Sequence, residues 1–62
     1  MKSRVDLIVD DRLIVEIKSV DGLHPAHTAQ VVSYLRLTRL RLGLLVNFNV
    51  PILKQGIRRV IR

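Results

Sequence analysis

Two carboxylates and a lysine interrupt the apolar runs at the start of this sequence. Asp6 lies inside the first run, while Glu16 and Lys18 close the second. Charged side chains are costly to bury, so three of them within such segments indicate a site rather than a surface. Two carboxylates facing one cavity can hold Mg²⁺ or Mn²⁺, which prefer oxygen ligands. The lysine could then orient or help to deprotonate a water that attacks a phosphodiester polarised by the metal.

These groups can meet only if the two runs form a β-hairpin of the correct register. The polar residues 10–12 separate the runs, and Lys18 shares a face with Glu16 because strand side chains alternate. A two-residue turn would place Asp6 and Glu16 on opposite faces of the hairpin, whereas a three-residue loop brings them directly opposite each other. We predict the three-residue loop, or a bulge with the same effect.

A helix predicted over 25–40 carries three further polar side chains on one face. A proline in the first turn is acceptable, and no glycine interrupts the segment before Gly43. At 100° per residue, His27, Gln30 and Tyr34 fall within an arc of about 60°. Each has an ordinary alternative, since a helical tyrosine often packs its ring and a histidine near a helix start is often only a surface residue.

The remaining pattern predicts an α/β fold. A right-handed crossover through the helix should return the chain to a strand parallel to the second one. An arginine-guarded edge strand follows after a break at 49–51. The expected elements are strand 4–9, strand 12–18, helix 25–40, strand 42–48 and a final strand near 56–61.

Asp6, followed by Glu16-Ile17-Lys18 and then Gln30-x-x-x-Tyr34, resembles the PD-(D/E)XK nuclease superfamily. More narrowly, the chain is similar to the GxxExxY protein family, a bacterial and archaeal branch of that superfamily. The segments that carry this resemblance occur in the family's order and lie at 4–9, 14–20, 27–30, 34–35, 43–48 and 56–60.

The resemblance implies a partial restriction-endonuclease-like core and roles for several residues. Asp6 and Glu16 would be Mg²⁺ or Mn²⁺ ligands, joined by the backbone carbonyl of Ile17, and Lys18 would orient the attacking water. The reaction implied is hydrolysis of phosphodiester bonds in nucleic acid, with DNA favoured over RNA. The supporting contacts, which include a histidine on the same helical face, would come from Gln30, Tyr34 and His27.

One part of the family pattern is missing from the chain. The helix carrying Gly-x-x-Glu-x-x-Tyr, and the strand after it, do not occur in 1–62. In the superfamily the first helix flanks the sheet and often contributes an acid to the metal cluster. We therefore expect a single truncated nuclease-like domain, which is either a fragment or a reduced member that borrows the missing surface from a second copy.

Composition points to a small basic protein that associates with itself. A domain of sixty-two residues buries only about 60% of its unfolded surface, and the chain has no cysteine for a disulfide. With 48% hydrophobic residues, one Phe, one Tyr and no Trp, the core must be aliphatic, and oligomerisation is the expected route to stability.

The net charge of +6 favours binding to the phosphates of nucleic acid. The alternative is that the arginines are solvated and only keep the protein soluble. A non-catalytic, oligomeric nucleic-acid-binding module or remnant therefore stands as the alternative to a nuclease. The apolar runs are far shorter than the roughly 20 residues that span a membrane, so we expect a cytoplasmic protein without membrane contact.

Overall fold

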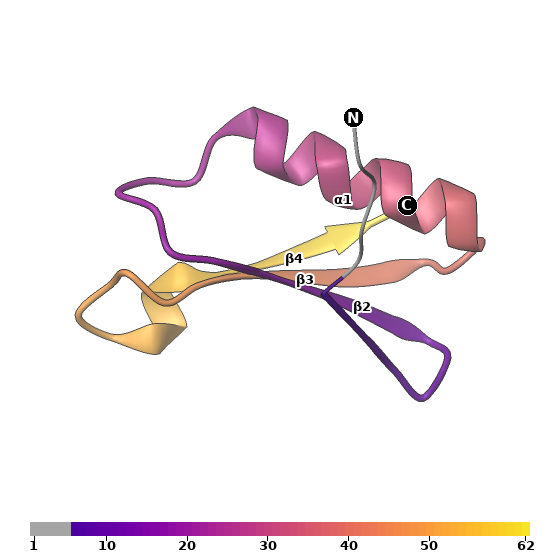
Figure 1. Ribbon diagram of the computed structural model, residues 1–62, viewed down its shortest axis with the longest axis horizontal. Helices are drawn as coiled ribbons and strands as arrows, with labels where there is room; N and C mark the ends of the chain where they lie inside the picture. Colours follow the sequence, from indigo (N-terminus) through magenta and orange to yellow (C-terminus); the bar gives the residue numbers. More distant parts are fainter. Residues whose placement is uncertain (1–5) are drawn as a thin grey trace.

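The apolar, β-branched runs of the sequence form the strands of a mixed sheet with one helix on one side (Figure 1). The structure is a computed structural model, and it describes residues 6–62. The elements are β1 Leu7–Val9, β2 Leu13–Lys18, α1 Pro25–Thr38, β3 Leu42–Asn47, the 3₁₀ turn η1 Leu53–Gly56 and β4 Ile57–Ile61.

The sheet has the order β1-β2-β3-β4 and combines two antiparallel pairs with one parallel pair. The parallel pair is β2 with β3, as expected when a helix carries the chain from one strand to the next. β4 returns antiparallel to β3 and lies at the edge, where the sequence predicts an arginine-guarded strand. The α/β prediction is confirmed, with the elements in the expected order.

The hairpin adopts the predicted three-residue loop. Val9 pairs with Leu13, and the backbone N–H of Arg12 donates to the carbonyl of Val9 over 3.0 Å. Asp10 and Asp11 take positive φ values of 54° and 52°, which aspartate tolerates better than most residues. Arg12 is therefore the additional residue that sets the register.

Several predicted boundaries shift by one or two residues. The helix predicted over 25–40 ends at Thr38, because Arg39 adopts a left-handed conformation with φ of 62°. The strand predicted over 12–18 begins at Leu13, and the one predicted over 42–48 ends at Asn47. The first strand is shorter than 4–9, although residues 4 and 5 lie outside the described part of the chain. Neither η1 nor its position after the break at 49–51 was predicted.

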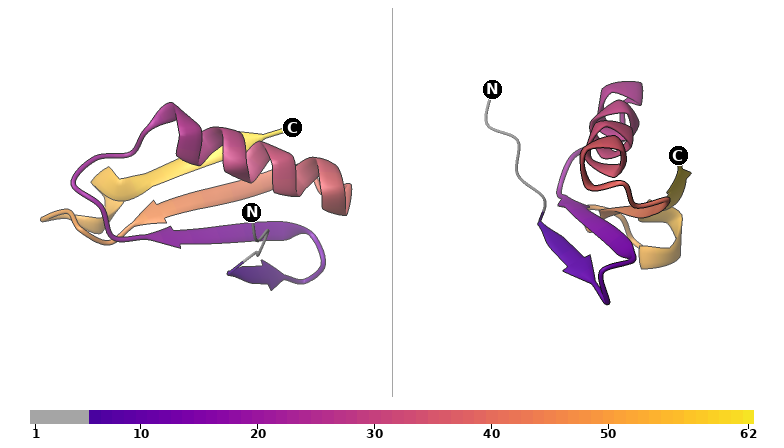
Figure 2. Two further views of the ribbon diagram at one scale, coloured as in Figure 1. Left: turned by 45° about the horizontal axis from the view of Figure 1, so that its top comes forward. Right: turned by 90° about the vertical axis from the view of Figure 1, so that its right-hand side faces the viewer.

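The hydrophobic core lies between α1 and the sheet face beneath it (Figure 2). Its aliphatic character agrees with the composition, and each fully buried side chain of this kind contributes about 1.5–3 kcal/mol. Among the described residues, no helix is long and apolar enough to cross a membrane. The buried core cluster consists of Ile14, Val31, Tyr34, Leu35, Leu45 and Val60.

Gly43 allows α1 to pack closely against β3. A Cβ atom at this position would lie 2.7 Å from Cγ1 of Val31, a core side chain of the helix. We expect Gly43→Ala to lower the free energy of unfolding by about 1–3 kcal/mol, because the helix would have to move away from the sheet. Urea denaturation would measure this loss.

Gly22→Ala is the matched control, since a Cβ at Gly22 would have no neighbour within 4 Å. Its free energy of unfolding should stay within about 0.5 kcal/mol of the parent or rise slightly. Equal losses for the two variants would contradict close packing at Gly43.

Candidate active site

Asp6 and Glu16 lie next to each other at the β1–β2 edge of the sheet. Leu7 pairs with Val15 in the antiparallel hairpin. Asp6, one residue before Leu7, therefore faces Glu16, one residue after Val15. The backbone N–H of Ile17 donates to Oδ2 of Asp6 over 2.8 Å. Glu16 is 3% exposed, although it is a carboxylic acid. The register therefore brings the two predicted carboxylates together.

The surroundings of Glu16 disfavour its charge. Burial raises the pKa of this carboxyl above its ordinary value of 4.5, and a side-chain hydrogen bond with Asp6 and the charge of Asp6 raise it further. Lys18 and the backbone of Asp6 act in the opposite direction and lower this pKa. Within the described residues, Oε1 of Glu16 is buried without a hydrogen-bond partner. Such a group is costly unless a further positive partner satisfies it.

These groups fit a hard divalent cation. They offer a buried carboxylate oxygen in need of a partner, with a second carboxylate beside it. The carbonyl of Ile17 should lie on the same side as Asp6, because the N–H and C=O of one strand residue point toward the same neighbour. No cluster of three or more His, Cys, Asp or Glu side chains occurs in residues 6–62. A metal here would thus complete its coordination with backbone oxygen, water or phosphate.

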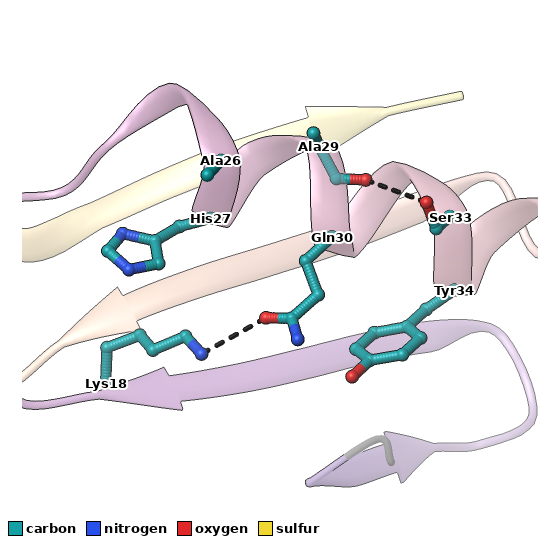
Figure 3. Close-up of a pocket in the computed structure, with 7 residues that line it drawn as sticks. All are labelled: Lys18, Ala26, His27, Ala29, Gln30, Ser33 and Tyr34. Atoms are coloured by element: carbon teal, nitrogen blue, oxygen red, sulfur yellow. Dashed lines mark hydrogen bonds between the residues drawn. The ribbon is translucent and has the colours of Figure 1, made fainter. Parts of the chain in front are cut away.

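Lys18 continues the site along β2 and meets the helix. Its Nζ donates to Oε1 of Gln30 over 3.2 Å. Figure 3 shows Lys18, Gln30 and Tyr34 directed into the space between α1 and β2. They line a pocket of about 500 Å³ together with Ala26, His27, Ala29 and Ser33. The predicted shared face of His27, Gln30 and Tyr34 is therefore present, and it opens toward the lysine.

His27 lines the pocket and also stabilises the start of α1. Its Nδ1 accepts a hydrogen bond from the backbone N–H of His24 over 2.9 Å and so caps the start of α1. In the neutral form this bond leaves the proton on Nε2, which can donate to a ligand. Tyr34 is 4% exposed and belongs to the core cluster, and it also contributes to the lining of the pocket.

Each carboxylate could instead have an ordinary surface role, and the structure bears differently on these two alternatives. An exposed ion pair between Glu16 and Lys18 is excluded, because Glu16 is buried and Lys18 donates to Gln30 instead. Asp6 is exposed at the edge of the sheet, as a solvated charge would be, yet its carboxylate accepts the N–H of Ile17. The ligand roles themselves remain predictions.

Asn47 is an important polar residue that the sequence analysis did not select. It is 2% exposed at the end of β3, where Oδ1 accepts the N–H of Val20 over 3.0 Å and Nδ2 donates to its carbonyl over 2.9 Å. Oδ1 also accepts the N–H of Asn49 over 3.1 Å. The amide thus fixes the chain just after Lys18. In the sequence, this residue is recognisable only as a polar side chain at the end of the apolar strand β3.

Comparison with known families gives one match that covers nearly the whole chain. The family model described as PD-(D/E)XK nuclease superfamily matches residues 1–60. Comparisons with the curated proteins and with the solved structures gave no match.

Glu16→Gln should stabilise the metal-free protein at neutral pH. The raised pKa of Glu16 means that the folded state retains the proton more strongly than the unfolded chain. This contribution is fully present below pH 4.5 and is lost as the pH rises through the folded-state pKa. The gain of the variant over the parent should therefore be larger at pH 7 than at pH 4, as measured by urea denaturation with a chelator present. A gain that shrinks with rising pH would contradict the burial of this carboxyl, and Asp11→Asn is the charge-matched control.

Asn47→Ala should lower the free energy of unfolding by about 1–3 kcal/mol, because the N–H and C=O of Val20 lose their amide partner. Asn49→Ala removes only an exposed 3.3 Å bond to Asp21 and should change stability by less than about 0.5 kcal/mol. Denaturation curves and amide hydrogen exchange at Val20 would check both. Unchanged exchange at Val20 in the first variant would show that Asn47 does not fix this segment.

Proposed function

This chain belongs to the PD-(D/E)XK nuclease superfamily, and we propose that it hydrolyses phosphodiester bonds of nucleic acid with a divalent metal at Asp6 and Glu16. The observation that carries the proposal is the buried Oε1 of Glu16, which lacks a hydrogen-bond partner among the described residues and lies beside a second carboxylate. A buried carboxylate with a purely structural role would be expected to have hydrogen bonds at both of its oxygens. The narrower place in the GxxExxY family remains a prediction from the sequence segments.

Three groups of the chain would hold Mg²⁺ or Mn²⁺. Asp6 and Glu16 supply carboxylate oxygens, and Ile17 supplies its backbone carbonyl. When bound, the metal would polarise the scissile phosphate and make its bound water more acidic. The hydrogen bond from Ile17 N–H keeps the Asp6 carboxylate at the sheet edge, next to Glu16.

Lys18 would orient the attacking water. Its side chain shares a face with Glu16 two residues away, about 7 Å along the strand. Gln30 holds the amino group over 3.2 Å and restricts its rotamers, which reduces the entropy lost on reaching the reactive geometry. Gln30 is therefore a positioning residue in this proposal.

The pocket between α1 and β2 would receive the substrate backbone next to the metal. Nε2 of His27 could donate to a phosphate oxygen, and Tyr34 belongs to the same lining. The chain is also strongly basic, with a net charge of +6. Arg12, Arg39 and Arg41 line a second pocket of about 340 Å³ at the opposite end of β2, together with Asp11. This distribution supports a polyanionic substrate, and DNA is the substrate we would test before RNA.

A non-catalytic nucleic-acid-binding module is the second candidate. The three arginines lie away from Asp6 and Glu16 and favour it, because this end of the sheet could bind phosphates without any metal chemistry. Asp10, 3.8 Å from Arg12, and Asp11, in the pocket lining, offset part of their charge. The two functions differ in their dependence on Glu16, which only the first requires.

Glu16→Gln should abolish metal-dependent cleavage, with a rate loss of at least about 100-fold. Labelled single- and double-stranded DNA and RNA would be incubated with the parent and the variant in Mg²⁺, in Mn²⁺ and in chelator. Asp6→Asn should give a similar loss, since asparagine keeps an oxygen for the Ile17 N–H but removes the charge. Asp11→Asn, an exposed turn variant with the same charge change, should cleave within about two-fold of the parent.

Metal binding would be followed in the same samples by NMR titration of backbone amides. Saturable shifts confined to the region of Asp6, Glu16 and Lys18, lost in Glu16→Gln, support the proposal. Cleavage that survives in this variant or in chelator would contradict it. Salt-sensitive binding without cleavage in either protein would favour the non-catalytic module.

A further inference from the structure

The side of the sheet that faces away from α1 is apolar across all four strands. The cross-strand row Val9, Leu13, Leu42 and Ile61 is aliphatic throughout, and the neighbouring row departs from this pattern only at Arg59. We call this side the outer face and define it by its exposed aliphatic residues. These are Leu7, Val9, Ile17, Leu42, Ile57 and Ile61, with exposed fractions from 37% at Leu42 to 64% at Ile61.

Of the described elements, only the short turn η1 contacts the outer face, and it does so at one end. Figure 2 shows α1 on the opposite side of the sheet. Among the described strand residues that point to this side, Val46 alone is buried, at the end of the sheet where η1 contacts β3. Sheets with parallel pairs are usually covered on both faces, and contiguous exposed apolar patches mark interaction sites. The outer face therefore needs an occupant.

We propose that this occupant is a second copy of the same chain, packed outer face against outer face about a two-fold axis. The two sheets would lie about 10 Å apart and bury their aliphatic side chains between them, as in a β-sandwich. Each copy keeps α1 on the outside, so the dimer has a helix, two sheets and a helix as its layers. This surface contact is separate from the proposed nuclease chemistry and does not depend on it.

The size of the outer face is sufficient for a dimer. Four strands about 4.8 Å apart and about five residues long give a projected area of roughly 320 Å². Side-chain relief raises the accessible surface to on the order of 500 Å² per copy, or about 1,000 Å² for the pair, which is the lower bound for a specific interface.

Charge favours self-association through this face rather than another. The protein carries +6 overall, so two copies would repel if their basic surfaces met. Arg59 lies on the edge strand β4, where its guanidinium can reach solvent at the rim. The outer face is otherwise uncharged, and it is the side on which like-charged copies can approach.

Leu42→Glu should dissociate the dimer, because it places a carboxylate from each copy in a desolvated interface. The parent should sediment at twice its 7.1 kDa mass at about 100 μM, while the variant should be monomeric or show a dissociation constant raised by at least about 100-fold. Leu37→Glu makes the same change at a helix residue that is 73% exposed on the other side of the molecule. It should remain dimeric.

A second measurement keeps the proposal testable if Leu42→Glu fails to fold. Isotope-filtered NOE spectra of a mixed labelled and unlabelled parent sample should show intermolecular methyl contacts among Leu7, Leu42 and Ile61. A folded monomer at 100 μM, an unfolded chain at that concentration, or a dimer whose contacts lie elsewhere would each overturn the proposal. Folding only after addition of a separate helical chain would show that a different partner covers this face.

Discussion

Because strand side chains alternate, one residue in the hairpin loop decides whether a site exists in this protein. Arg12 follows the two left-handed aspartates and moves the β1–β2 pairing by one step, so that Asp6 faces Glu16. Without that residue the two carboxylates would point to opposite sides of the sheet. The contribution of Asp6 to the raised pKa of Glu16 and the proposed metal ligation by this pair both depend on this register.

The single helix has two structural roles that cannot be separated. Its inner surface covers one side of the sheet and forms the core with Ile14 and Leu45, while its exposed edge presents Gln30 to Lys18. Gly43 permits the short distance between the helix and β3 that both roles require. A change that loosens the core should therefore also alter how the lysine is held, which couples stability to the site.

Asp6 and Glu16 form an acidic pair within a basic chain, and the fold holds the two carboxylates close enough to repel each other when both are charged. Burial beside Asp6 raises the pKa of Glu16, and Lys18 offsets this only in part. Such an arrangement costs stability in the absence of a cation, and proteins tolerate that cost mainly where it serves binding or catalysis. The outer face is a second feature of this kind, because its aliphatic side chains are exposed in the described part of the chain and the proposed dimer would cover them.

The sequence by itself determined the order of the elements, the odd-length loop and the superfamily. These features follow from local information, namely apolar runs, turn residues and the spacing of Asp6, Glu16 and Lys18, and the match over residues 1–60 agrees with them. Only the tertiary structure decided that Glu16 is buried, that Lys18 is held by Gln30 and that Asn47 fixes the chain after β2. Burial and hydrogen-bond partners depend on how α1 and β3 pack against β2. Residues far apart in the chain set that packing, and no local pattern encodes it.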